Sequence, residues 1–189
     1  MTTPVGEGVE LRWRPFQLYP NIDTAGVDRG EHLRQRYGAS ADIALIPERI
    51  RAEAESEGIT LRFDLIKRTP NTLLAHRLLE HAYDTYGFDL QNALSERLFR
   101  AYFCEGKDAG DQQVLLQLAA DVGMNEISAT TYLNSGAGTD EVESQLARAP
   151  DLGVGGVPAY ILAGSFLLPG AQSVDTISQI ITRAKIRLA

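Results

Sequence analysis

The stretch GVGGVPAYILAGSFLLPGAQ, residues 153–172, raises the first question about the fold. Its glycines lead to Val157-Pro158, directly before a short apolar run. Proline cannot donate a hydrogen bond to a sheet, so it belongs at a strand's first residue or on an edge. Two apolar segments, Ala159–Leu162 and Phe166–Leu168, flank a short turn, which is typical of a β-hairpin. We predict a cis bond before Pro158, because a cis bond fixes a sharp turn.

Outside the hairpin, the hydrophobic period is close to that of an α-helix. The closing residues 173–188 predict an amphipathic helix with Ile177, Ile180, Ile181 and Ile186 facing inward. Upstream helices are predicted over 28–38, 40–58, 69–87, 89–106, 109–124, 125–136 and 139–153.

Several residues predict where these helices begin and end. Ser40, Thr69 and Asp111 are expected N-caps, Asp140 and Glu143 are spaced as in a capping box, and Gly38, Gly58 and Gly87 are expected stops. Pro47 is expected to kink or break the helix predicted over 40–58.

Two further segments alternate in hydrophobicity. VELRWRPF, residues 9–16, predicts a half-buried strand in which Val9, Leu11 and Trp13 face the core. ITLRFD, residues 59–64, predicts a second strand or an extended link. So few strands cannot form a sheet that faces water, so we expect helices to cover it.

The composition excludes several classes of function. The net charge is −7 and the basic residues are scattered, which argues against a nucleic-acid surface. No apolar run is long enough to cross a membrane, and the first ten residues do not resemble a signal peptide, so we expect a cytoplasmic protein with no membrane partner. The single cysteine, Cys104, excludes an internal disulfide and a multi-thiolate site. We expect no metal and no cofactor.

The chain resembles a known family in four pieces that occur in the right order. These are VELRWRPFQLYPNI (9–22), GITLRFDLIKRTPNTLLAHRLLEHA (58–82), LFRAYFCEGKDAGD (98–111) and GVGGVPAYILAGSFLLPGAQSVDTISQII (153–181). Together they resemble the cytoplasmic DsbA-like oxidoreductases of the FrnE type, which have a thioredoxin fold.

The resemblance implies an α/β, thioredoxin-like fold, incomplete at the N-terminus, with a large all-helical insertion between the second strand and the cis-proline hairpin. It divides the chain into a discontinuous thioredoxin-like part, 1–65 and 138–189, and a helical insertion, 66–137. It also implies dithiol–disulfide exchange on thiol or peptide substrates. The residues expected to bind substrate are Gly156, Val157 and Pro158.

The chain departs from the family at the catalytic motif. The family's C-x-x-C opens the first helix, between a first strand and the strand that 9–16 matches, and this sequence contains no C-x-x-C. A strand–helix–strand unit takes about 30 residues, and only eight precede Val9. Either the start lies too far downstream, which we favour, or a natural paralogue has lost its redox half. We therefore expect no catalytic residue here, no disulfide exchange by the family mechanism, and a strand edge open to dimerisation.

Single residues have plainer interpretations. Cys104 is expected to be a packing residue, although Arg100 one turn away could lower its pKa. His81 is expected to be hydrogen-bonded and partly buried, and His76 to form a solvated pair with Glu80.

Two alternative functions stay open at this point. One is a redox-inactive peptide-binding or chaperone-like module that uses the strand edge beside Pro158. The other is a relative of glutathione-dependent isomerases or kappa-type transferases, which share the fold and the Val-Pro step. The PGAQ that follows the hairpin, residues 169–172, resembles the oxidoreductase branch more closely.

Overall fold

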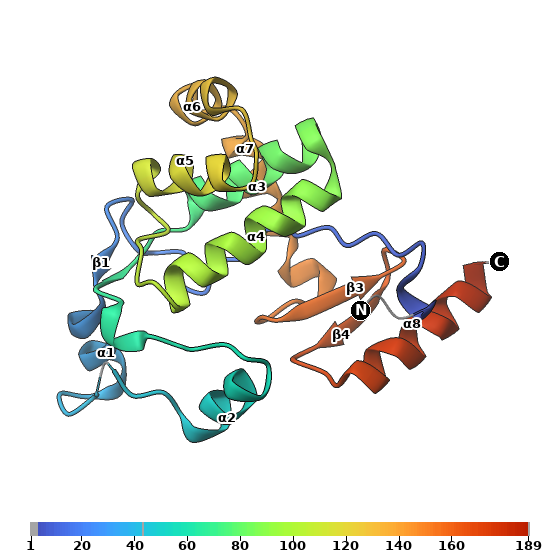
Figure 1. Cartoon of the computed structure of the whole chain (residues 1–189), viewed down its shortest axis with the longest axis horizontal. Helices are drawn as coiled ribbons and strands as arrows, with labels where there is room; N and C mark the ends of the chain where they lie inside the picture. Colours follow the sequence, from blue (N-terminus) through green and yellow to red (C-terminus); the bar gives the residue numbers. More distant parts are fainter. Residues whose placement is uncertain (1–3, 43, 189) are drawn as a thin grey trace.

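The computed structural model describes residues 4–42 and 44–188. Its largest part is a bundle of helices (Figure 1). The bundle contains α3 (Leu73–Tyr86), α4 (Phe88–Phe103), α5 (Gln112–Asp121), α6 (Glu126–Asn134) and α7 (Thr139–Arg148).

The hydrophobic core lies inside this bundle. Leu78 of α3, Leu94 of α4, Leu115 and Leu118 of α5 and Ala129 of α6 are all fully buried. They recur at helical spacing, so each helix presents one apolar stripe to the others. Full burial of a leucine side chain stabilises a fold by about 2 kcal/mol, so the bundle holds most of the molecule's hydrophobic stabilisation.

Local signals located several helix ends correctly. α1 (Arg29–Tyr37) begins after Asp28, whose carboxylate accepts a hydrogen bond from Glu31 N at 2.8 Å. Gly38 follows it with φ 98°, and Gly87 follows α3 with φ 84°, both in the region that favours glycine. Asp111 accepts from Gln113 N and Val114 N at the start of α5. These ends confirm the predicted stops and the predicted cap at Asp111.

The helix predicted over 40–58 is shorter in the structure. α2 spans only Glu48–Ser56, and Pro47 stands directly before it. Proline lacks an N–H, so it begins a helix more easily than it continues one. Pro47 therefore breaks the predicted helix and precedes a shorter one, and Ser40 is not its cap. Ile43 lies outside the described residues.

One other predicted helix start is wrong, and one predicted capping box does not form. Thr69 lies in a strand, α3 begins at Leu73, and Asn71 Oδ1 accepts from Leu73 N at 2.9 Å. α7 begins after Gly138, with no side-chain cap, so Asp140 and Glu143 do not form a capping box. α3 therefore begins later than predicted, whereas α7 begins at Thr139 as predicted but without the capping box.

The strands form two small antiparallel sheets. β1 (Val27–Asp28) pairs with β2 (Arg68–Thr69). β3 (Ala159–Leu162) pairs with β4 (Phe166–Pro169) as the predicted hairpin, with Ile161 opposite Leu167. The fold is therefore mixed α/β and rich in helices.

The strand predicted over 9–16 is wrong. The segment is irregular, and side chains of α4 take hydrogen bonds that a neighbouring strand would otherwise make. Gln91 Oε1 accepts from Trp13 N at 2.9 Å, while Gln91 Nε2 donates to Trp13 O at 3.1 Å. Trp13 packs edge-on against Phe99, but Val9 and Leu11 are 42% and 48% exposed, so the predicted inward face does not form.

The segment ITLRFD behaves as the extended link. Residues 59–62 belong to neither strand nor helix, and Phe63–Leu65 form the short 3-10 helix η2. Arg62 N donates to Phe103 O at 2.8 Å, which ties the link to the end of α4.

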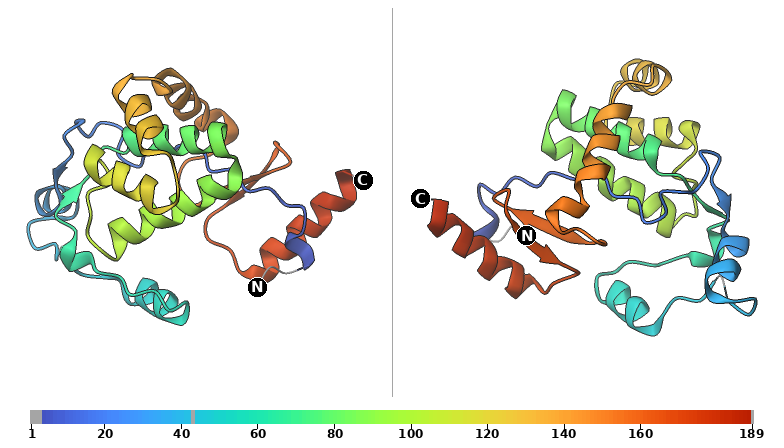
Figure 2. Two further views of the ribbon diagram at one scale, coloured as in Figure 1. Left: turned by 45° about the horizontal axis from the view of Figure 1, so that its top comes forward. Right: turned by 180° about the vertical axis from the view of Figure 1, so that it is seen from behind.

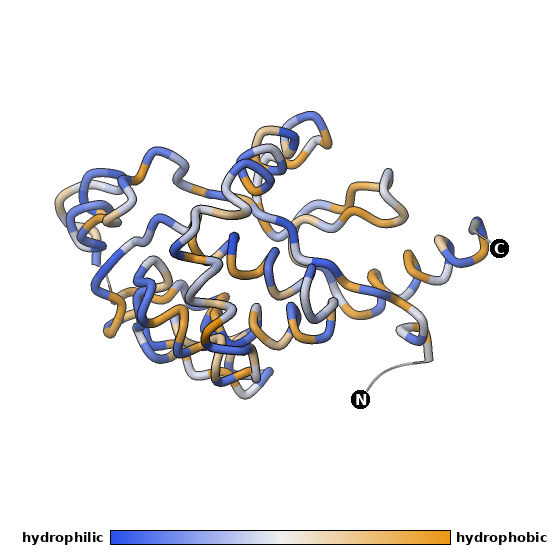
Figure 3. The backbone as a smooth tube through the Cα atoms, turned by 90° about the horizontal axis from the view of Figure 1, so that it is seen from above, coloured by the Kyte–Doolittle hydropathy of each residue, from blue (hydrophilic) through white to orange (hydrophobic). Residues whose placement is uncertain are grey.

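The hairpin and the last helix form a separate lobe beside the bundle (Figure 2). The short 3-10 helix η3 (Pro150–Leu152) leads into the hairpin, and α8 (Val174–Leu188) follows it. Apolar residues recur along the hairpin and along α8 (Figure 3). Ile177, Ile180 and Ile181 are partly buried as predicted, but Ile186 is 72% exposed, because the helix extends beyond the elements that cover it.

The N-terminal segment joins the two parts. η1 (Pro4–Gly6) packs on α8, and Lys185 Nζ donates to Val5 O at 3.0 Å and also to Glu7 O. From there the chain runs to the bundle, where Gln91 holds Trp13 (Figures 1 and 2). Within the described residues, no helix is both long enough and apolar enough to cross a bilayer.

Candidate functional site

The candidate site lies where η3 turns into the hairpin. Gly153 follows η3 with a φ of 78°, which favours glycine, and Val154 N donates to Ala149 O at 2.9 Å. A Cβ on Gly153 would stand 3.1 Å from Leu167 of the opposite strand, so glycine also lets the two segments approach closely. The Val157–Pro158 peptide bond is cis, as predicted.

A shallow hollow of about 350 Å³ opens on this turn. Its lining includes Gly155, Gly156, Val157 and Pro158, and it contains no charged side chain. A Cβ built on Gly155 or Gly156 would meet nothing within 4 Å, so the backbone there faces open space. Val157 is 49% exposed and Pro158 is exposed as well. The hollow therefore offers backbone and apolar surface to a ligand.

The three residues predicted to bind substrate are brought together by this turn. Gly156, Val157 and Pro158 all line the hollow, and Gly170 N donates to Pro158 O at 2.8 Å. This bond closes the open end of the hairpin and fixes the proline against it.

Cys104 is not part of this site. It follows the last residue of α4, where its N–H donates to Arg100 O at 2.9 Å, and its side chain is partly buried. The Arg100 guanidinium binds Glu96 at 2.9 Å. That contact gives Arg100 a partner other than the thiol, which supports the packing interpretation of Cys104.

His76 and His81 differ in their burial and in their hydrogen-bond partners. His76 Nε2 lies 3.2 Å from Phe16 O, and burial lowers the pKa of His76 to about 4. The predicted solvated pair of His76 with Glu80 is therefore wrong, because the N-terminal segment covers this part of α3. His81 is hydrogen-bonded as predicted, to Ser128 at 3.1 Å and Thr85 at 3.2 Å, and partial burial lowers its pKa.

A buried ion pair escaped the sequence analysis. Arg12 Nη2 lies 2.8 Å from Glu80 Oε2, and the Glu80 side chain is only 3% exposed. The same guanidinium stands 3.8 Å above the ring centre of Tyr83. The partners are 68 residues apart, so no local pattern could have indicated this contact. It anchors the N-terminal segment on α3.

A second hollow, of about 330 Å³, lies beside the first small sheet and is polar. Arg68 and Asp108 line it and form an ion pair at 3.4 Å. Across the part of the chain that the structure describes, no group of three or more histidine, cysteine or acidic side chains is arranged to hold a metal.

Comparisons with known proteins identify the family. The model of the DsbA-like thioredoxin domain matches residues 3–182. The chain therefore belongs to the family of DsbA-like thioredoxin domains. YwbO of Bacillus subtilis (strain 168), described as an uncharacterized protein, is 26% identical over 178 residues, which are 94% of this chain and 83% of that protein.

Solved structures agree with this assignment. A crystal structure titled "probable DsbA oxidoreductase" from Streptomyces coelicolor is 26% identical, with a TM-score of 0.76 over 96% of this chain and 78% of that one. A 2-hydroxychromene-2-carboxylate isomerase is 17% identical, with a TM-score of 0.60 over 84% of this chain and 89% of that one. At that identity the isomerase supports the thioredoxin-like fold alone.

Proposed function

We propose that this chain binds thiol-bearing or extended polypeptide substrates at the hairpin beside Pro158. The observation that carries the proposal is the uncharged hollow at Gly155–Pro158, where exposed backbone and the apolar Val157 side chain are both available to a ligand. Exposed backbone near a strand end is where extended peptides dock in many domains. Membership of the DsbA-like family supports thiol substrates.

We also propose that this chain does not catalyse disulfide exchange by the family's two-cysteine mechanism. In that reaction a protein disulfide is reduced to two thiols while two substrate thiols are oxidised to a disulfide. A single cysteine can form a mixed disulfide, but it has no second thiol on the same chain to resolve it. Cys104 also stands at the end of α4, outside the hollow.

The proposal includes a division of labour within the chain. The discontinuous part, 1–65 and 138–189, carries the docking site, and the helical insertion, 66–137, carries most of the core. The burial of the α3–α6 residues supports this division. A cytoplasmic location remains part of the same proposal.

A binding assay tests the docking site. A fluorescein-labelled peptide with one alkylated cysteine is titrated with the protein, and its anisotropy gives the dissociation constant. Pro158→Ala is expected to weaken binding about tenfold, which corresponds to ~1.4 kcal/mol. Pro47→Ala, directly before α2 and outside the hollow, serves as the control and should bind like the wild type. Equal binding by all three proteins would contradict the proposed site.

A turnover assay tests the absence of exchange activity. The assay follows the oxidation of a reduced dithiol peptide by glutathione disulfide. We expect neither the wild type nor Cys104→Ser to make this oxidation faster than the uncatalysed rate. Rapid turnover that survives Cys104→Ser would refute this part of the proposal.

A further inference from the structure

α2 lies apart from the helical bundle, at the end of two connecting segments (Figures 1 and 2). None of its residues is buried, and no side chain caps its first turn. A helix shorter than about 12 residues is only marginally stable in water by itself, and α2 has nine residues. A helix of this kind gains stability when a partner covers it.

The charges of α2 are arranged against its own helix dipole. A helix N-terminus favours acidic side chains, and a C-terminus favours basic ones. In α2, Arg49 and Arg51 lie in the first half, whereas Glu53 and Glu55 lie near the end, where no basic side chain occurs. Only Glu48, in the first turn, is placed as the dipole favours. The charges therefore destabilise α2 as an isolated helix.

α2 also carries a small apolar face. Ile50 and Ala54 are four residues apart, so they lie on the same side of the helix. Ile50 is 47% exposed, and Ala54 is partly buried. In an antiparallel pair of α2 helices centred on residue 52, Ile50 of each copy lies opposite Ala54 of the other. A large side chain then packs beside a small one, as in the ridges and grooves of packed helices.

Charged side chains flank this apolar face on both sides. Arg49 and Glu53 lie on one side, and Arg51 and Glu55 lie on the other, each pair being four residues apart. Within one helix this order, with the basic residue first, is the weaker one, and Arg51 lies 4.0 Å from Glu48 instead. Two-fold symmetry brings the same patch of both copies together. Each arginine then meets a glutamate of the second copy.

We propose that α2 is a dimerisation helix that pairs in antiparallel orientation with α2 of a second copy of this chain. The pairing brings opposite charges and opposite dipole ends together, and it covers Ile50. Nine residues of helix span only about 14 Å, and the net charge of −7 on each copy opposes association. The interface is therefore small, and the dimer is weak and transient.

Sedimentation velocity of the full chain, over a range of protein concentrations, measures the association. We expect a reversible dimer that Ile50→Asp weakens at least tenfold, because this change puts a carboxylate in the apolar face. Ile127→Asp is the matched control, because Ile127 is 78% exposed on α6, and it should dimerise like the wild type. A monomer at every concentration would overturn the inference and point to a helix of another protein as the partner.

Charge-reversal variants test whether α2 pairs with itself. One variant combines Arg49→Glu with Arg51→Glu, and the other combines Glu53→Arg with Glu55→Arg. Each alone should dimerise at least tenfold more weakly, because like charges then face each other. An equimolar mixture should associate at least as strongly as the wild type, since opposite charges meet throughout. A mixture that stays monomeric would overturn the inference.

These variants should keep the fold, because all four charged side chains are exposed. Thermal unfolding followed by circular dichroism checks this for each variant. Peptide binding at Pro158 serves as an independent readout. Binding that survives Ile50→Asp leaves the proposed function standing, whatever the outcome for the dimer.

Amide hydrogen exchange locates the contact. α2 is only marginally stable in the monomer, so the amides of residues 52–56 should exchange at least tenfold more slowly at concentrations where the dimer forms. The amides of α6, which has the same length, should not change with concentration. A dimer that leaves exchange in α2 unchanged would place the interface elsewhere and overturn the inference.

Discussion

His76 lies in the first half of α3, and the N-terminal segment covers it, so its imidazole is held neutral. Burial lowers its folded-state pKa to about 4, compared with 6.5 in an unfolded chain. The unfolded state therefore binds a proton more readily. The stabilisation is complete above about pH 7 and is lost as the pH falls from 6.5 to 4, with a total of roughly 3 kcal/mol.

Urea unfolding at pH 7 and at pH 4.5 measures this effect. His76→Gln, which stays neutral and can still donate to Phe16 O, should lose much less stability between the two pH values than the wild type does. His81→Gln is the comparison, because His81 is less deeply buried and its pKa is lowered as well, and it should reduce the pH dependence of stability by less than His76→Gln does. If His76→Gln lost as much stability between pH 7 and pH 4.5 as the wild type does, another group would dominate the pH dependence.

Alanine substitutions at two glycines that share the same φ distinguish backbone strain from steric overlap. Gly58 and Gly106 both have φ of 69°. A Cβ on Gly58 would meet nothing within 4 Å, whereas one on Gly106 would lie 2.6 Å from Leu65 O. Gly58→Ala should cost about 1 kcal/mol through the left-handed conformation. Gly106→Ala should lower the free energy of unfolding by about 1–3 kcal/mol more, because the added methyl group overpacks against Leu65.

The two alanine variants are compared by denaturant unfolding. The difference between them, rather than either value alone, reports on the approach of the α4–α5 loop to η2. Equal losses of stability in the two variants would mean that Leu65 moves aside at no cost.

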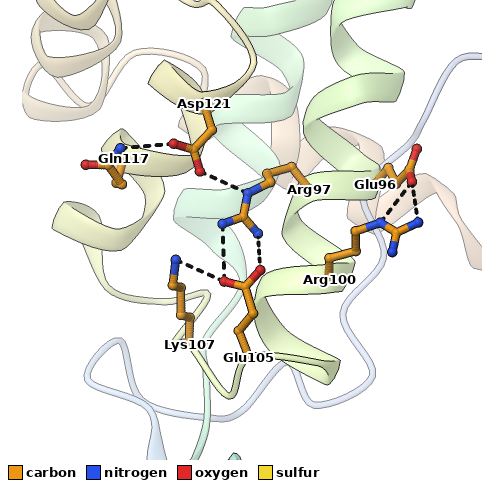
Figure 4. A network of polar contacts seen from close by, with 7 residues as sticks. All are labelled: Glu96, Arg97, Arg100, Glu105, Lys107, Gln117 and Asp121. Atoms are coloured by element: carbon orange, nitrogen blue, oxygen red, sulfur yellow. Dashed lines mark hydrogen bonds and ion pairs between the residues drawn. The ribbon is translucent and has the colours of Figure 1, made fainter. Parts of the chain in front are cut away.

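At the scale of elements, a network of charged side chains joins α4 to the following loop and to α5 (Figure 4). Arg97 lies 2.7 Å from Glu105 and 2.9 Å from Asp121. The bond from Arg97 lowers the pKa of Glu105, and hydrogen bonds from Gln117 and then Arg97 lower the pKa of Asp121. Lys107 adds a contact to Glu105 at 3.0 Å. Arg97 is the shared partner, so its loss leaves two carboxylates without their main counterion.

Arg97→Met should lower the free energy of unfolding by roughly 0.5–1 kcal/mol, and by less in high salt. Arg100→Met is the control in the same helix, because Arg100 pairs only locally with Glu96, one turn away. That variant should change stability little. A salt-independent loss in Arg97→Met would indicate lost packing of the arginine stem instead.

The elements also show what could be predicted from the sequence. Asp111, Gly38, Gly87 and the Val-Pro hairpin act through neighbours a few residues away, and all were located correctly. The segment 9–16 was misassigned because its partners are Gln91 and Glu80, far along the chain. Alternating hydrophobicity indicates an extended chain, but it does not say whether a strand or a helix supplies the hydrogen bonds.

The candidate site was predictable for the same reason, since Gly156, Val157 and Pro158 are consecutive. What the sequence could not indicate was how the base of the hairpin is held together. That depends on the carbonyl of Pro158 pairing with Gly170 and on the side chain of Gln172 occupying Pro169 O.

At the scale of the whole molecule, stability is unevenly distributed. Most of the fully buried hydrophobic residues lie in α3–α6, and none of the described residues from 150 to 187 is buried to that degree. Local stability follows buried apolar contact. The hairpin and α8 should therefore open at a lower free energy than the bundle does.

Native-state hydrogen exchange in low urea tests this expectation. The inward amides of Tyr160 and Leu162 should exchange through a smaller opening free energy than those of Leu98 and Ala119. Exchange of all four amides at the global unfolding free energy would show instead that the lobe and the bundle unfold as one unit.

The outer edge of β4 also limits how far any assembly can grow. An open-ended fibre needs two complementary edges on every subunit, one to receive a strand and one to present the next. Here Pro169 lacks an N–H and its carbonyl accepts from Gln172 Nε2, so the outer edge of β4 pairs poorly with a further strand. The β4 side of the hairpin is therefore poorly suited to the strand-by-strand growth of an assembly.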